Sequence, residues 1–239
     1  MQSSEAGKVV VITGATGGIG EAVARALSGA GYSLVLSAPS AEKLTALASQ
    51  LGGPCTVVAG NLSDETIPET LLYAAIDRFG RCDACVNNGG LLEAGLIETI
   101  DIERLCNMVR VNVEGAFRVA YVFLKHFVEE GQGHLVNVSG GVGKNVRPTV
   151  YGATQRSIEL LSEALSAELA GTDVHVSCIQ PGLVKSGLRD RWVVFQENQT
   201  TVADTLEPAD VARMVLFVLK KTVDERVPGA ADSPSVNQI

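Results

Sequence analysis

A glycine-rich turn between an apolar run and a run of helix formers constrains the fold of this chain more than any other stretch. Residues 13–20 read TGATGGIG, and they follow residues 8–12, a β-branched run typical of a buried strand. Residues 21–27 have the spacing of a helix. This order predicts a turn that holds a pyrophosphate, because glycines let the backbone approach the anion and the helix N-terminus offers free N–H groups. The alternative is a glycine turn that binds no ligand. If the turn does bind the pyrophosphate, the candidate contacts are Gly14, Thr16, Gly18, Ile19 and Gly20.

Strands and helices alternate along the rest of the chain. Apolar, β-branched runs predict further strands at residues 33–37, 56–59, 84–86, 135–138 and 174–179. Helical spacing predicts helices at residues 41–51, 66–79, 102–128, 151–169 and 208–219, and Thr66 is the expected N-terminal cap of the second. The order predicts an α/β fold, a doubly wound parallel sheet in a single Rossmann-like domain over residues 1–239. Residues 185–205 interrupt the alternation and are predicted to form a lid.

Composition narrows the class of protein. The net charge of −8 disfavours a nucleic-acid partner, which would need a clustered basic face. The sequence has no run of eighteen apolar residues, so it predicts no membrane span. The first residues lack the pattern of a secretory signal. Five cysteines suit a reducing, cytoplasmic setting. Cys82 and Cys85 have CxxC spacing but are interpreted as a strand entrance, and the three histidines predict no metal site.

Several motifs agree in order and spacing with one family. Beyond the glycine turn, residues 86–90 read VNNGG after a predicted strand, Asn112 lies inside the long predicted helix, and Tyr151 begins another helix. Over nearly its whole length the chain resembles the classical short-chain dehydrogenase/reductase family. The resemblance implies an NAD(P) cofactor, held also by Asn61, Leu62, Asn88, Gly89, Tyr151, Pro181, Gly182, Val184 and Ser186.

The resemblance also implies a reaction. In the family, hydride passes between the nicotinamide and an alcohol or carbonyl carbon, a tyrosine supplies or accepts the hydroxyl proton, and a serine bonds the substrate oxygen. Here the matching residues are Tyr151 and Ser139, and Asn112 would help to hold a proton-relay water. Ser139 could instead satisfy a backbone group at the strand end, with Gly140 in the serine's place.

The sequence departs from the family at the residue four positions after the tyrosine. The family has a lysine there, whose charge lowers the pKa of the tyrosine. This chain has Gln155, which gives YxxxQ in place of YxxxK; glutamine can hydrogen-bond a ribose hydroxyl but carries no charge. Residues 37–40, SAPS, offer neither an acid for NAD nor an arginine for NADP, and Asn61 replaces an aspartate, so the choice of cofactor stays open.

Three functions are compatible with these features. The first is an NAD(P)-dependent oxidoreductase with an atypical active site, acting on a carbonyl or alcohol that the apolar lid predicts to be hydrophobic. The second is a catalytically impaired member that serves as a binding or assembly partner. The third is non-redox acid–base chemistry at Tyr151. The family resemblance further implies a homodimer or homotetramer, and residues 236–239 could begin a seventh strand.

Overall fold

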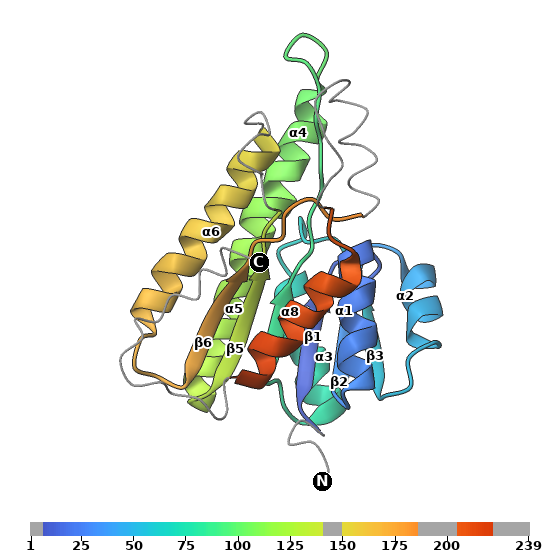
Figure 1. Cartoon of the computed structure of the whole chain (residues 1–239), viewed down its shortest axis with the longest axis vertical. Helices are drawn as coiled ribbons and strands as arrows, with labels where there is room; N and C mark the ends of the chain where they lie inside the picture. The colour runs from blue at the N-terminus through green and yellow to red at the C-terminus, as the bar shows by residue number, and fades with distance from the viewer. Residues whose placement is uncertain (1–6, 141–149, 186–204, 222–239) are drawn as a thin grey trace.

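The central element is a parallel sheet of six strands in the order β3-β2-β1-β4-β5-β6 (Figure 1). The computed structural model describes residues 7–140, 150–185 and 205–221. The strands are β1 (Val9–Thr13), β2 (Ser33–Ala38), β3 (Cys55–Ala59), β4 (Ala84–Asn87), β5 (Gly133–Val138) and β6 (Val174–Ile179). The strand order reverses between β1 and β4, and in folds of this kind the ligand crevice lies at the carboxyl edge beside such a switch point. The predicted doubly wound α/β fold is confirmed.

Helices cover both faces of the sheet. On one face lie α1 (Gly18–Gly29), α2 (Ala41–Ala48) and α8 (Pro208–Lys221), packed on Val10 and Ile12 of β1. On the other lie α3 (Ile67–Phe79), α5 (Ala116–Glu130) and α6 (Val150–Glu168), packed on Val9 and Val11. Alternate residues of β1 pack on opposite faces of the sheet, because successive side chains of a strand point to opposite sides. Burial of both strand faces explains the uninterrupted apolar run of β1.

Some expected details differ. Thr66 does not cap α3 through its side chain; its backbone N–H and its hydroxyl both donate to Asp64 Oδ1, at 2.9 and 2.8 Å. Helix α2 ends at Ala48 rather than near residue 51. The predicted seventh strand and all but the two ends of the predicted lid lie outside the described residues.

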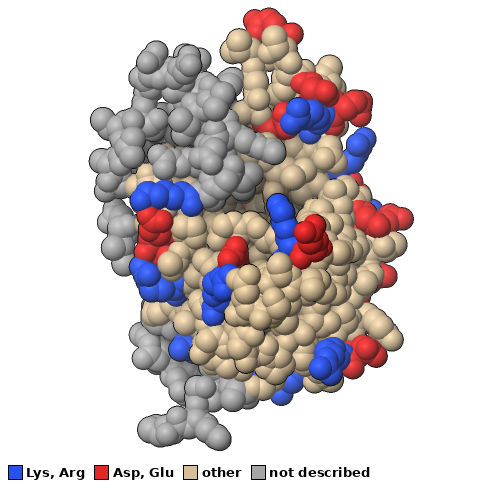
Figure 2. Space-filling model, turned by 90° about the vertical axis from the view of Figure 1, so that its right-hand side faces the viewer, with Lys and Arg blue, Asp and Glu red and all other residues tan. Residues whose placement is uncertain are grey.

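Charged side chains of both signs are interspersed on the face shown in Figure 2. Close pairs such as Arg25 with Glu21, at 2.7 Å, are exposed and contribute little to stability. No described helix is long and apolar enough to cross a membrane. All five cysteines are free, and Cys82 and Cys85 are buried at the start of β4. Within the described ranges, no group of three or more acidic, histidine or cysteine side chains could hold a metal ion.

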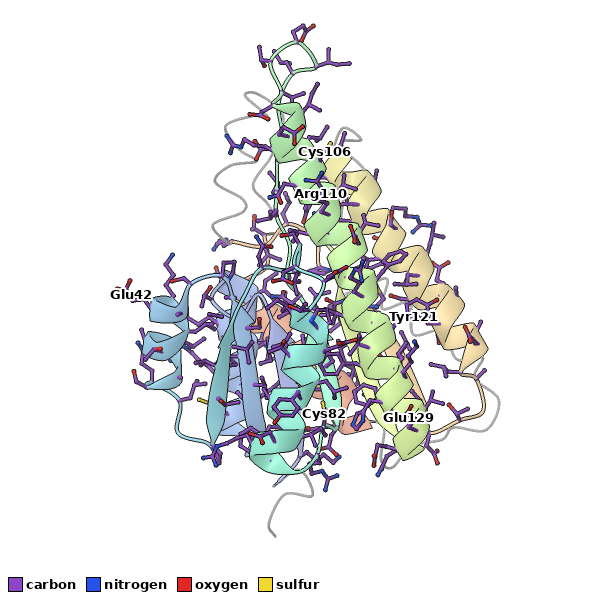
Figure 3. All side chains as sticks on the ribbon, turned by 180° about the vertical axis from the view of Figure 1, so that it is seen from behind. Glu42, Cys82, Cys106, Arg110, Tyr121 and Glu129 are labelled. Carbon is purple, nitrogen blue, oxygen red and sulfur yellow. The ribbon has the colours of Figure 1, made fainter. Side chains whose placement is uncertain are left out.

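The long helix predicted over residues 102–128 is interrupted. It consists of α4 (Ile102–Val109), a π-helix η1 (Arg110–Gly115) and α5, which follow one another as a single column in Figure 3. The prediction of one regular helix is therefore wrong in its middle. A π-helix is rare and is frequently found at functional sites. This one carries Asn112.

Candidate active site

The turn after β1 is shaped for close backbone contacts. Gly14 has φ +65°, and a Cβ there would lie 2.8 Å from Gly89 Cα. A Cβ on Gly20 would lie 2.2 Å from the Gly14 carbonyl oxygen. Thr16 is half-buried, Gly17 and Gly18 are exposed at the turn, and α1 begins at Gly18 without a side chain bonded to its first N–H groups. The turn therefore presents unobstructed backbone donors, which fits the binding of a pyrophosphate.

The loop after β4 is fastened to this turn. Thr13 Oγ1 accepts the backbone N–H groups of Asn88 and Gly89, both at 2.9 Å. Asn88 Nδ2 donates to the Thr13 carbonyl at 3.1 Å. A Cβ on Gly89 would approach Leu62 Cδ1 to 2.6 Å, so Leu62, from the loop after β3, fills the space that a side chain at position 89 would need. Asn88 and Gly89 thus shape the crevice through the backbone.

Tyr151 lies against Gly140. A Cβ built on Gly140 would be 2.1 Å from Tyr151 Oη and 3.0 Å from its Cζ, so the phenol occupies the space that a side chain at position 140 would need. Burial raises the pKa of Tyr151 to about 12. At neutral pH the phenol is therefore protonated and can donate a hydrogen bond or a proton.

Gln155 is buried one turn after Tyr151, and both ends of its amide are bonded. Its Oε1 accepts the Gly140 backbone N–H at 2.5 Å. Its Nε2 donates to Thr154 Oγ1 at 3.4 Å. Gln155 thus joins α6 to the end of β5, a contact that sequence reasoning did not anticipate.

The π-helix turns Asn112 into the site. Asn112 Oδ1 accepts the Leu91 N–H at 2.7 Å, and its Nδ2 donates to the Leu91 carbonyl at 2.8 Å and to Thr154 Oγ1 at 3.1 Å. Thr154 Oγ1 in turn donates to the Tyr151 carbonyl at 2.7 Å. Both amide hydrogens of Asn112 are therefore used by the protein, and only an Oδ1 lone pair is left to accept from a water.

Ser139 makes a different contact from the one that the family resemblance implies. Its hydroxyl is fully buried and donates to Glu159 Oε1 of α6 at 3.3 Å. Asn137, two residues earlier, donates to Ser162 Oγ of the same helix at 2.8 Å. The period of the strand therefore directs both side chains to α6, and it is Gly140 that faces the Tyr151 hydroxyl.

The remaining predicted cofactor contacts lie around the edge of the crevice. Asn61 Oδ1 accepts the Ser63 N–H at 3.1 Å, a local turn contact. Pro181 and Val184 are buried, Gly182 is exposed, and Val184 bridges Leu206. Ser186 lies outside the described residues. Ser40, after β2, caps α2 by accepting the Lys43 N–H at 3.3 Å. These contacts favour neither nucleotide.

A small cavity of about 70 Å³ collects many of these residues at the carboxyl edge of the sheet. It joins side chains and backbone from six elements or their adjoining loops: Ile19, Asn87, Asn88, Gly89, Gly90, Asn112, Ala116, Val138, Ser139, Gly140, Tyr151, Gln155 and Ile158. A larger open groove of about 980 Å³ lies at the opposite edge and includes all three histidines. The four predicted catalytic residues line the small cavity together with three of the predicted cofactor contacts, Ile19, Asn88 and Gly89. Thr154 and Leu91, which hold Asn112, were missed because neither matches a motif.

The doubly wound sheet, the glycine turn after β1 and the small cavity that Tyr151 lines define an α/β protein with a Rossmann-like fold. The family model described as short chain dehydrogenase matches residues 8–196. The chain belongs to the short-chain dehydrogenase family.

Similar proteins agree with this membership. An uncharacterized oxidoreductase of Staphylococcus epidermidis is 35% identical over 214 residues, covering 89% of this chain and 90% of the relative. An uncharacterized oxidoreductase of Staphylococcus aureus strain USA300 is 32% identical over 215 residues, with the same coverage. The 3-ketoacyl-(acyl-carrier-protein) reductase from Brucella melitensis, solved with NADH, has a TM-score of 0.83 at 26% identity and covers 92% of this chain and 95% of its own. A metagenomic short-chain oxidoreductase solved with NADP has a TM-score of 0.77 at 27% identity, covering 94% and 96%.

Proposed function

We propose that this protein is an NAD(P)-dependent oxidoreductase that interconverts a carbonyl compound and its alcohol, with Tyr151 as the proton donor. The observation that carries the proposal is the position of the Tyr151 phenol, which lies against Gly140 in the cavity beside the crevice. The solved relatives with NADH and NADP support a nicotinamide cofactor. The residues that would hold it are those of the glycine turn and the Asn88–Gly89 loop.

When bound, the nicotinamide supplies the hydride for reduction or accepts it for oxidation. Tyr151, protonated at neutral pH because burial raises its pKa, donates its hydroxyl proton to the carbonyl oxygen during reduction. Asn112 holds the Leu91 backbone, and Thr154 links Asn112 to Tyr151, so these two residues fix the cavity wall on which the substrate rests. Without a lysine at position 155, the phenol has no cation at that position to favour its ionised form.

The test combines binding and turnover. NADPH and NADH are titrated into the protein by calorimetry, and a panel of apolar ketones is then assayed with the nucleotide that binds. Micromolar binding of one nucleotide and ketone reduction that Tyr151→Phe removes would support the proposal. Tyr73→Phe, on the exposed surface of α3, is the matched control. Absence of nucleotide binding up to millimolar concentrations would rule out hydride transfer.

A second candidate is a nucleotide-binding partner with little or no catalysis. The observation that favours it is the contact between Gly140 and Tyr151: no hydroxyl stands beside the phenol at position 140, and the Ser139 hydroxyl is bonded to Glu159. Nucleotide binding without turnover of any carbonyl or alcohol would select this function. Turnover of a substrate without nucleotide, still dependent on Tyr151, would select non-redox acid–base chemistry.

We further propose that two or four copies assemble through the outer face of α5 and α6. Tyr121 and Val128 of α5 and Leu160 of α6 are 47%, 55% and 53% exposed, and Figure 3 shows Tyr121 on the outer side of its helix. Burial of such side chains against a second copy stabilises the assembly by removing apolar area from water. Light scattering of the protein and of Leu160→Glu tests this: the variant should be monomeric, and a monomeric parent would contradict the proposal.

A further inference from the structure

The side chain of Gln155 is placed to control the tyrosine beside it. It is buried, and its carbonyl oxygen accepts the Gly140 N–H at 2.5 Å. Gly140 is the first residue after Ser139, whose own N–H is bonded to Ile179 of β6 at 3.0 Å. Gln155 therefore accepts the first backbone N–H beyond the hydrogen bonds of the sheet.

Gly140 and the Tyr151 hydroxyl compete for the same space. A single carbon added to Gly140 would lie 2.1 Å from Oη, far inside any non-bonded contact. A displacement of the Gly140 backbone by a fraction of an ångström toward α6 would likewise press on the phenol. The position of Oη thus depends on where the Gly140 backbone is held.

The other end of the Gln155 amide ties this contact to the rest of the cavity. Gln155 Nε2 donates to Thr154 Oγ1, which also accepts from Asn112 and donates to the Tyr151 carbonyl. The amide is thereby oriented: the nitrogen faces the threonine, and the oxygen faces Gly140. A lysine in this position has donors only and could not accept the Gly140 N–H.

We propose that Gln155 is a positioning residue, which holds the Gly140 backbone so that the Tyr151 hydroxyl has one fixed place in the cavity. The role rests on the proposed function only in taking Tyr151 as the proton donor. It differs from that of a ribose ligand, because the Gln155 oxygen is directed to the protein backbone. The burial that raises the pKa of Tyr151 agrees with a phenol seated tightly against Gly140.

The test compares two substitutions of nearly equal length. Gln155→Glu keeps an acceptor oxygen for the Gly140 N–H, whereas Gln155→Met removes it. In the free protein, NMR hydrogen exchange reports the Gly140 amide, and carbon-13 labelling of the tyrosine ring reports the ionisation of Tyr151, with Tyr151→Phe to assign its signal. The amide of Val136, in the middle of β5, shows whether each variant is folded.

The inference requires exchange at Gly140 to rise at least tenfold in Gln155→Met, with Val136 unchanged, and to return to the parent rate in Gln155→Glu. The Tyr151 pKa should fall by one unit or more in Gln155→Met. Equal exchange and equal Tyr151 titration in the parent and Gln155→Met would overturn it, as would a Gln155→Glu variant that behaves like Gln155→Met. Both measurements use the free protein, so a failure to reduce any ketone would count against the proposed function alone.

If Gln155→Met does not fold, Gly140→Ala replaces it as the test variant. An unchanged Tyr151 titration in Gly140→Ala contradicts the contact, and a shift of one unit or more supports it.

Discussion

Asn88 holds the β4 loop to Thr13 of β1 through two hydrogen bonds that it donates: its N–H donates to Thr13 Oγ1 at 2.9 Å, and its Nδ2 donates to the Thr13 carbonyl at 3.1 Å. Thr13 is fully buried, and its hydroxyl also accepts the Gly89 N–H. One hydroxyl therefore satisfies two backbone groups at the bottom of the crevice, and its removal leaves both without that acceptor.

The first prediction concerns this hydroxyl. Thr13→Val keeps the shape of the side chain but leaves two partly buried N–H groups without their acceptor, so the free energy of unfolding should fall by about 1–3 kcal/mol. Nucleotide binding should weaken as well, because the loop loses its attachment. Urea unfolding and calorimetry measure the two effects. Thr56→Val makes the same chemical change on the half-buried edge strand β3 and should change neither by much.

The second prediction concerns the glycine turn. A Cβ on Gly20 would meet the Gly14 carbonyl at 2.2 Å, so Gly20→Ala must open the turn, and nucleotide affinity should fall at least tenfold. Gly29→Ala, at the other end of α1, meets nothing within 4 Å and is the matched control. Calorimetric titration of both variants gives the answer, and equal affinities would show that this turn is not the nucleotide site.

The third prediction is a pH dependence that differs with the direction of the reaction. Since the pKa of Tyr151 is raised to about 12, the phenol stays protonated across pH 6–9, and the rate of ketone reduction should be flat there. Alcohol oxidation needs the ionised phenol, which is about one molecule in ten thousand at pH 8 and grows tenfold per pH unit. Initial rates in both directions check this. An oxidation rate that is flat from pH 7 to pH 10 would contradict the role of Tyr151 as the base.

The fourth prediction follows from a buried histidine far from the site. Burial, and secondarily the neighbouring charge of His175, lower the pKa of His134 to about 3. The unfolded chain binds a proton near pH 6.5 that the folded protein does not bind, so stability is full above pH 6.5 and is lost as the pH falls toward 3, by at most about 5 kcal/mol. Urea unfolding from pH 7 to pH 4 should show this loss in the parent and a smaller one in His134→Gln.

The fifth prediction concerns the residue that departs from the family pattern. Gln155→Lys should lower the pKa of Tyr151 through its charge and shift the oxidation profile to lower pH. The same change removes the acceptor of the Gly140 N–H, so stability should fall by about 1–3 kcal/mol. The pH–rate profile and urea unfolding separate the two effects. A gain in stability would show that the Gly140 contact is unimportant.

Much of this arrangement could be predicted from the chain alone, because the relevant signals are local. The β-branched runs and helical spacing determine the order of strands and helices, and parallel topology then brings Asn88, Gly140 and the start of α6, with Tyr151, to one edge. The direction of Ser139 could not be predicted, since it depends on which face of β5 meets α6. The hydrogen bond between Gln155 and the Gly140 N–H could not be predicted either, because the two residues are fifteen positions apart and no motif joins them.

The interruption at η1 was also beyond local reasoning. Residues 110–115 contain no proline, and their apolar spacing continues a regular helix. What distinguishes them is the pair of hydrogen bonds between Asn112 and the Leu91 backbone, a contact made across 21 residues. Tertiary contacts of this kind override helix propensity and leave no trace in a sequence window.

The wide turn at η1 changes the phase of everything that follows it. A π turn holds about one residue more than an α turn, so α5 is rotated by roughly 100° relative to a regular continuation of α4. Helices α4 and α5 can therefore pack against different parts of the molecule: Met108 of α4 accepts the Glu93 N–H, while Phe123 of α5 packs in the sheet core. Insertion of one residue into a uniform helix would normally misplace its whole apolar stripe. Here the stripe of α5 depends on that extra residue, and its deletion would turn Phe123 away from the sheet.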